Sequence, residues 1–116
     1  MLLNRGVSIK TLTIANGEAE SEAFDMSISA GATILMPAAW TAANIGFQVS
    51  DAEEGTFVPL YDADAAIVEV AAEASKAFTC PAELFGCAWV KLWSQDGAGS
   101  DENQGGDRSI TLLLKS

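Results

Sequence analysis

The 116-residue sequence contains no histidine, and this absence excludes several kinds of chemistry. Histidine is the commonest side chain in acid–base catalysis and the usual partner of a catalytic serine or cysteine. It is also a frequent zinc ligand, and the two cysteines, Cys80 and Cys87, cannot supply four nitrogen and sulfur ligands by themselves. We therefore expect no enzyme, no catalytic residue, no metal site and no cofactor.

Cysteine is also scarce. Cys80 and Cys87 are separated by six residues, and a disulfide across such a short turn is one way to use them. Two buried free thiols fit the chain better, because it shows no export signal. The apolar start, residues 1–3, is too short for one, and the polar pair Asn4 and Arg5 follows at once. We expect a protein made in the cytoplasm.

Basic residues are few: six Lys and Arg stand against 16 Asp and Glu, which gives a net charge of −10. A surface of this sign repels nucleic acid and anionic membranes, so neither is an expected partner. No apolar run approaches the ~20 residues that a membrane helix needs. Solubility explains the acidic surplus most simply. An acidic surface that faces a partner, or a set of cation sites, is the alternative.

Apolar and polar residues alternate in short stretches, and a period of two is typical of half-buried β-strands. The clearest stretch is residues 44–50, where Ile45, Phe47 and Val49 point to one side. A corner precedes it, in which the Trp40 ring closes the end of a core. Strands are expected at residues 7–14, 23–28, 32–36, 44–50, 56–61, 66–70, 77–79, 87–95 and 108–115.

Turn signals separate these stretches at fairly even spacing, and no repeat or domain boundary interrupts them. About eight short strands of this kind predict an all-β fold, an antiparallel β-sandwich of jelly-roll type, with a barrel as the other architecture. The sandwich is expected to be a single domain over residues 1–116. Residues 1–6 are expected to form an N-terminal arm, and residues 96–107 a flexible acidic loop.

Some finer expectations concern single segments. In the second expected strand, Phe24, Met26 and Ile28 should all face the core, because they alternate with polar residues. Residues 38–43 are expected to form a turn of helix or 3₁₀-helix. Residues 81–85 should form a one-turn helix, because a proline stands near its start.

Tryptophan is concentrated on one expected strand face. In residues 87–95, Trp89, Lys91 and Trp93 share the face opposite to the apolar one. Tryptophan and tyrosine are enriched where proteins contact one another, so this face is a candidate interface. The alternative is a strand buried on both faces, from which the Lys91 ammonium reaches solvent. The predicted interface residues are Trp89, Lys91, Trp93, Phe57 and Tyr61.

Two other sites can be considered. The tryptophans of this strand, with Trp40 and Tyr61, are the aromatic residues from which a sugar-stacking platform could be built. Asp62 and Asp64 begin like a calcium-binding loop, but the glycine and the closing glutamate of such a loop are missing. We therefore expect a hairpin turn there and no metal site.

Several segments together resemble small structural proteins of tailed bacteriophages, over residues 13 to 114 or so. They are ILMPAAWTAA (residues 34–43), FQVSD (47–51), TFVPLYD (56–62), WVKLWS (89–94), NQ (103–104) and RSITL (108–112). The resemblance implies a virion component, and most of all a capsid decoration (cement) protein. Such proteins bind the outside of the head lattice, often as trimers, and resist the internal pressure of DNA. It therefore implies the major capsid protein as partner, a homo-oligomer with a trimer favoured, synthesis in the host cytoplasm and a final place on the capsid exterior.

A second resemblance is looser. The segments FQVSD (residues 47–51), GTF (55–57) and WVKL (89–92) are similar to strands of galactose-binding-like jelly rolls. This resemblance agrees with the expected fold and implies a sugar site in loops at one end of the sandwich. A carbohydrate-binding or tail-associated adhesion module is therefore the alternative function.

Overall fold

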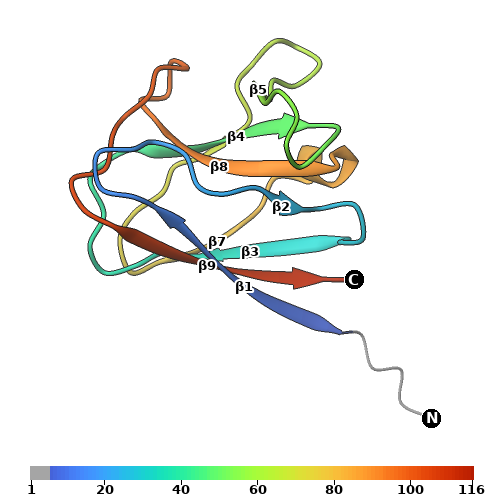
Figure 1. Ribbon diagram of the computed structural model, residues 1–116, viewed down its shortest axis with the longest axis horizontal. Helices are drawn as coiled ribbons and strands as arrows, with labels where there is room; N and C mark the ends of the chain where they lie inside the picture. The colour runs from blue at the N-terminus through green and yellow to red at the C-terminus, as the bar shows by residue number, and fades with distance from the viewer. Residues whose placement is uncertain (1–5) are drawn as a thin grey trace.

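The computed structural model describes residues 6–116, so the expected arm over residues 1–6 lies almost wholly outside the described residues. Two antiparallel β-sheets pack face to face, as Figure 1 shows, and the predicted all-β sandwich is confirmed. The described residues contain the strands β1 (Val7–Ile14), β2 (Phe24–Asp25), β3 (Gly31–Leu35), β4 (Asn44–Ser50), β5 (Val58–Pro59), β6 (Glu69–Val70), β7 (Ala77–Thr79), β8 (Trp89–Gln95) and β9 (Arg108–Lys115), and the 3₁₀ turn η1 (Ala82–Gly86).

The strands pair from the two ends of the chain inward: the first strand pairs with the last, and the second with the second last. β1 pairs with β9, β2 with β8, β3 with β7, and β4 with both β5 and β6. A long antiparallel hairpin has this pairing, and rolling it up adds the β3–β9 and β4–β8 pairs. The resulting orders, β1-β9-β3-β7 and β2-β8-β4-β5, are those of a jelly roll. β5 and β6 both pair with β4 and together occupy one strand position, so the nine strands fill eight positions of the jelly roll.

The alternating pattern supplies the core between the sheets. Ile45 and Phe47 of β4, and Val90 and Leu92 of β8, are 0% exposed. Each such side chain contributes about 1.5–3 kcal/mol of stability relative to an exposed one. The other fully buried apolar side chains come from both sheets, the β2 segment and η1: Leu12, Ile14, Phe24, Met26, Ile34, Leu84, Ile110 and Leu112.

The second strand ends earlier than expected. Phe24 and Met26 are buried, but Ile28 is 78% exposed, so its predicted inward orientation is wrong. The reason is a local turn, in which the Asp25 carboxylate accepts hydrogen bonds from the hydroxyl (2.6 Å) and the amide (2.8 Å) of Ser27. The hydroxyl bond, and after it the amide bond, lowers the pKa of Asp25. The alternation read from sequence cannot detect this change of direction.

Of the two expected short helices, one forms. η1 confirms the helical turn after Pro81, whereas residues 38–43 adopt no helical turn. Thr41 is instead held in an irregular segment by the side chain of Gln104, which is 63 residues away in the chain. A sequence pattern with local range does not reveal such a long-range partner.

Gln104 anchors the 96–107 loop to the sandwich, and its side chain is only 1% exposed. Its carbonyl oxygen accepts hydrogen bonds from the Thr41 amide (2.9 Å) and from Arg108 Nε (3.1 Å). Its amide nitrogen donates to the Thr41 carbonyl (3.1 Å) and to Ser94 Oγ (2.9 Å). The side chain thus uses its full hydrogen-bonding capacity. The flexibility expected for residues 96–107 stays a prediction.

Replacing Gln104 with leucine should lower the free energy of unfolding by about 2–4 kcal/mol, because it leaves several partly buried polar groups without partners. Urea denaturation followed by tryptophan fluorescence measures this loss. Asn103→Leu is the matched control, since Asn103 is exposed, and it should change stability by less than about 0.5 kcal/mol. Equal losses in the two variants would contradict the anchoring role.

Candidate interaction surfaces

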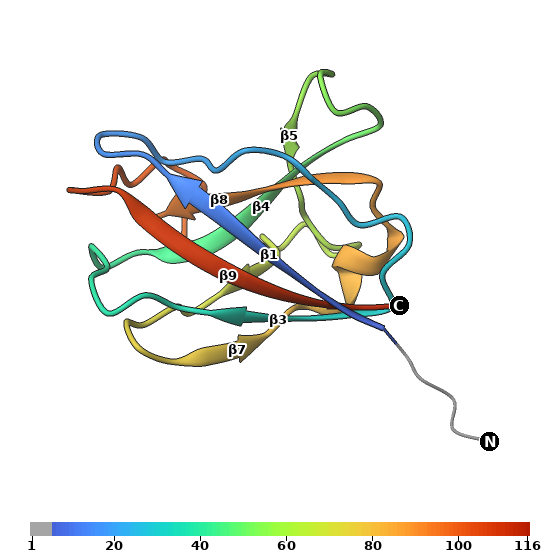
Figure 2. The same cartoon turned by 60° about the horizontal axis from the view of Figure 1, so that its bottom comes forward.

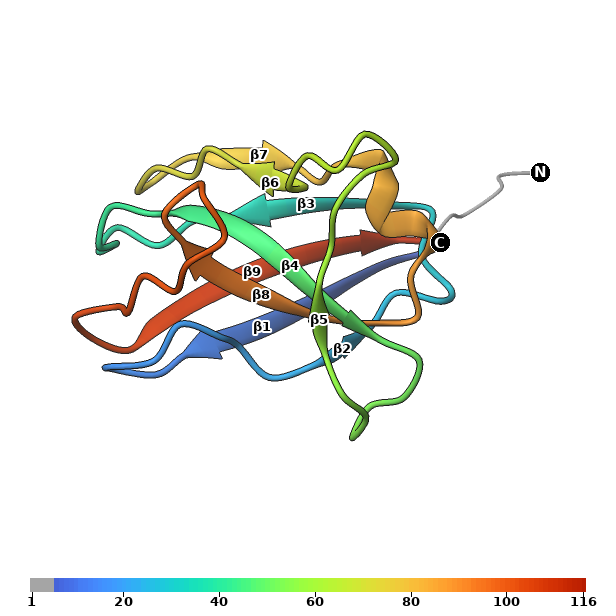
Figure 3. The same cartoon turned by 90° about the horizontal axis from the view of Figure 1, so that it is seen from above.

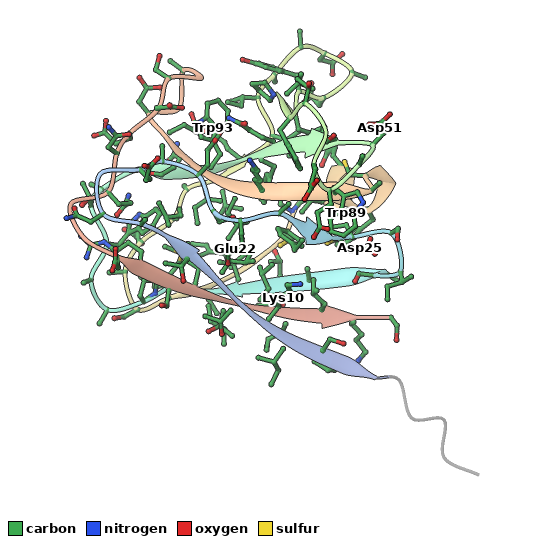
Figure 4. All side chains as sticks on the ribbon, viewed as in Figure 1. Lys10, Glu22, Asp25, Asp51, Trp89 and Trp93 are labelled. Atoms are coloured by element: carbon green, nitrogen blue, oxygen red, sulfur yellow. The ribbon has the colours of Figure 1, made fainter. Side chains whose placement is uncertain are left out.

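The predicted interface residues of β8 project from the outer face of the β2-β8-β4-β5 sheet. In the β4–β8 register, Trp93 lies opposite Gly46, and Lys91 lies opposite Gln48. Trp89 is on the same face, but Figure 4 shows Trp89 and Trp93 near opposite ends of the strand. The predicted shared face is therefore present, although the two indole rings do not form one patch.

Trp93 is covered by its own chain and is 2% exposed. Its ring lies so close to Gly46 that a Cβ added there would come within 2.8 Å of Trp93 Cε3. The indole nitrogen donates a hydrogen bond of 2.7 Å to Oδ1 of Asp101, in the 96–107 loop. The prediction that Trp93 belongs to an exposed interface is wrong for this reason: the loop already occupies the place of a partner.

Polar residues close the rest of this end of the face. Oε2 of Glu69 accepts hydrogen bonds from Gln95 Nε2 (2.5 Å) and from Asn44 Nδ2 (3.2 Å). Gln95 Oε1 accepts a hydrogen bond of 2.6 Å from the Gly97 amide. Within the described residues, every buried side-chain nitrogen or oxygen has a hydrogen-bond partner. We conclude that this network is structural, since it leaves no buried polar group for a ligand.

The remaining predicted residues surround the other half of the face. The Lys91 ammonium lies 4.5 Å from the centre of the Phe57 ring, which is a cation–π contact. Phe57 follows the 51–55 hairpin loop, and Figure 3 shows β5 crossing over β4 and β8 in this region. Lys91, Phe57 and Trp89 are half-buried, and Tyr61 is 47% exposed. For these four residues the interface stays a prediction.

A groove of about 490 Å³ opens between the hairpin and the turn that precedes β8. The sugar-stacking platform does not form around it. Trp93 is buried, and Trp40 packs against the core while its Nε1 donates to the Ala43 carbonyl at 3.2 Å. Trp40 is thus the corner residue that the sequence predicted. The groove is lined by Val49, Ser50, Asp51, Thr56, Val58, Gly86, Cys87 and Ala88.

The outer face of the β1-β9-β3-β7 sheet is chemically different. All 16 acidic residues lie outside its four strands. The inward positions of these strands hold the core, so the alternate positions face outward, and Lys115 at one corner is the sole charge among them. We call the other outward residues the threonine face: Val7, Ile9, Thr11, Thr13, Gly31, Thr33, Leu35, Ala77, Thr79, Ser109, Thr111 and Leu113.

Apolar side chains are exposed on the threonine face: Ile9 is 72% exposed, Val7 54% and Leu35 36%. A hollow of about 380 Å³ lies among Val7, Gly31, Ala32, Thr33, Leu113 and Lys115. Exposed apolar residues gathered in one uncharged area are typical of protein contact surfaces. The sequence contained a signal for it, since the odd positions of residues 7–13 are valine, isoleucine, threonine and threonine, and no acid occurs in residues 7–13 or 108–115. This pattern indicates a contact surface only when both segments are known to belong to one sheet.

Both cysteines are free and partly buried, which confirms the expected free thiols. Burial raises the pKa of the Cys80 thiol to about 12, and burial also raises the pKa of Cys87. Cys87 lies in the wall of the open groove. Among the described residues, no group of three or more acids and cysteines is arranged to hold a metal ion.

Comparison with known proteins identifies one solved structure of the same architecture. No family model matches the chain, and no curated protein matches it significantly in sequence. The crystal structure of the SPBc2 prophage-derived protein YomS is similar over 100% of both chains, with a TM-score of 0.60 and 15% sequence identity. The similarity shows the fold. In the described part of the chain, no helix has the length and apolarity that a membrane crossing requires.

Gly46→Ala tests the close packing of the Trp93 ring against the backbone at position 46. The added methyl group would meet Trp93 Cε3 at 2.8 Å and Gln95 Cγ at 3.1 Å, so the ring must shift. We expect a loss of about 1–3 kcal/mol in unfolding free energy and altered tryptophan fluorescence. Gly86→Ala is the control, because nothing lies within 4 Å of an added Cβ there. Unchanged fluorescence in Gly46→Ala would contradict the close contact.

Thiol reactivity tests the two cysteine environments. At pH 8 a thiol with a pKa of about 12 is ionised in roughly one molecule in ten thousand, and only the thiolate reacts. We expect iodoacetamide to modify Cys87 well before Cys80, as followed by peptide mass spectrometry. In urea the two rates should become similar. Equal rates in the native protein would show that Cys80 is more accessible than the structure indicates.

Proposed function

We propose that the chain is a structural protein of a phage virion that decorates the outside of the head by binding the major capsid protein. Two lines support the proposal: the resemblance to structural proteins of tailed phages, and the full-length fold similarity to a prophage-derived protein. The protein would act by adhesion without catalysis, cofactor, nucleic acid or membrane. It would be made in the host cytoplasm and join the capsid exterior as a homo-oligomer, for which the resemblance implies a trimer.

The threonine face is the observation on which the proposal rests. A chain of net charge −10 is repelled by most acidic surfaces, but this face presents no acid at all. It is broad, because four strands contribute to it, as Figure 2 shows for β1, β9, β3 and β7. Burying exposed apolar area on it would yield about 25 cal/mol per Å². A protein contact of ordinary size covers about 800 Å² of each partner, and such a sheet face suits a contact of this kind.

The distribution of acids supports an orientation in which the threonine face contacts the capsid. Acidic residues occupy the other sheet, the loops that connect the strands and the 51–55 hairpin; the acids of the other sheet and of the hairpin would face away from the capsid. Charges of one sign on the exterior keep decorated particles apart in solution. The Lys91–Phe57 contact and the groove beside it lie on that exterior side, so they would be accessible on the particle.

Introducing charge into the threonine face should abolish head binding. Leu35→Glu and Thr79→Glu place carboxylates on β3 and β7, and burying them against a partner without counter-charges would cost several kcal/mol. Binding is measured by co-sedimentation of the purified protein with empty heads of the phage that encodes it. We expect the unmodified chain to sediment with the heads and the double variant to lose at least about tenfold in affinity.

Ala52→Glu, in the exposed hairpin, is the matched control and should bind like the unmodified chain. Circular dichroism must show that each variant is folded. Absence of binding by the unmodified chain would contradict decoration of the head. Equal binding by the double variant and the control would contradict the threonine face as the contact surface.

A further inference from the structure

β1 is the end strand of its sheet, and its outer edge is largely open. Within the described residues β1 pairs with β9 along its whole length on one side. On the other side, contacts occur at the last two residues alone: the Thr13 amide donates to Glu22 at 2.9 Å, and Ile14 bridges Ser21. No other segment within residues 6–116 therefore pairs with the edge from Gly6 to Leu12. In Figure 1 this part of β1 forms the lower margin of its sheet.

The backbone groups at the open edge can be assigned by parity. In an antiparallel pair, alternate residues direct their N–H and C=O groups to the partner strand and the others direct them away. The Ser116 amide donates to the Gly6 carbonyl, so even-numbered residues of β1 face β9. The Thr13 amide donates outward, which confirms that odd-numbered residues face the edge. Val7, Ile9 and Thr11 thus have both backbone groups directed at the open edge.

We propose that two copies of the chain associate by antiparallel pairing of their β1 edges about a two-fold axis at Ile9. Ile9 then lies opposite Ile9 of the second copy, and Val7 lies opposite Thr11. Each of these opposed pairs exchanges two hydrogen bonds, so the three pairs form six. The two four-stranded sheets become one continuous sheet, whose outer surface is the threonine face of both copies.

The side chains favour this register over its neighbours. Centring the pair on Lys10 would place two ammonium groups directly opposite each other, which is destabilising. Centring it on Thr11 would pair Ile9 with Thr13, whose amide already donates to Glu22. Centring it on Ile9 instead sets Lys10 opposite Ser8 and places two β-branched isoleucines side by side, which suits a strand pair.

Charge and symmetry both favour a second copy of the chain as the partner of this edge. The strand carries no acid, so two chains of net charge −10 can meet there with little direct repulsion between carboxylates. The long-range repulsion that remains should be screened by salt, so association should strengthen as ionic strength rises. An edge that pairs with itself closes as a dimer, unlike the trimer that the family resemblance implies.

Cysteine cross-linking tests the register. Ile9→Cys should form a disulfide-linked dimer under mild oxidation, since directly opposed residues have Cα atoms about 5.5 Å apart. Ser8→Cys and Lys10→Cys should each remain uncross-linked alone, but a mixture of the two should form a mixed dimer. The unmodified chain controls for Cys80 and Cys87. Self-cross-linking of Lys10→Cys in preference to Ile9→Cys would overturn the proposed register.

A proline tests the pairing itself. Ile9→Pro removes an outward N–H that β9 does not use, so the monomer should keep its melting temperature while dimer affinity falls at least about tenfold. Ile9→Val keeps the N–H and should dimerise normally. Analytical ultracentrifugation over a range of concentrations and salt measures both. A chain that stays monomeric throughout, or a proline variant that still dimerises normally, would overturn the proposal.

The test is independent of the proposed function, because head binding is assayed with changes on β3 and β7, away from the open edge. Failure to bind heads by a chain that dimerises would contradict decoration alone. A mass that Ile9→Pro leaves unchanged would overturn the two-copy proposal whatever the variant does to head binding, because Ile9 also belongs to the threonine face.

Discussion

The contact between Trp93 and Gly46 governs how the molecule presents its two faces. A side chain at position 46 would collide with the indole ring, so the ring can lie flat on the sheet because glycine is beneath it. The ring then lies within reach of Asp101, and the hydrogen bond to that carboxylate draws the following loop over the sheet. One half of the outer face of the β2-β8-β4-β5 sheet is thereby closed by the chain itself.

Closure on that side leaves the threonine face as the broad uncharged surface of the sandwich. The rolled-hairpin topology explains why the acids are so unevenly distributed. Strands β1, β3, β7 and β9 form one sheet, and none of them contains an acid, whereas the loops and the other sheet contain all of them. A strongly acidic chain can thus be soluble and still offer one surface for protein contact, since charge is kept off the area that must be desolvated.

Much of the fold could be predicted from residue alternation, because a half-buried strand needs a period of two whatever it pairs with. The strands at residues 44–50 and 108–115 were found with their boundaries for this reason. Ile28 was placed wrongly because an Asp25–Ser27 turn redirects the chain. The candidate site was predicted less well: alternation placed Trp93 on the outer face, but the loop that covers this residue comes from a segment whose composition indicates solvent exposure.

The sequence alone determined the fold class, the corner at Trp40 and the side of the strand to which each residue of β4 and β8 points. These properties depend on local spacing and composition. Tertiary structure decided which strands are neighbours, and therefore that residues 7–13 and 108–115 build one acid-free face. It also decided that Trp93 is buried, that the Gln104 side chain binds Thr41, 63 residues away, and that β1 is left at an edge. Each of these outcomes depends on contacts between residues far apart in the chain, and no local pattern specifies them.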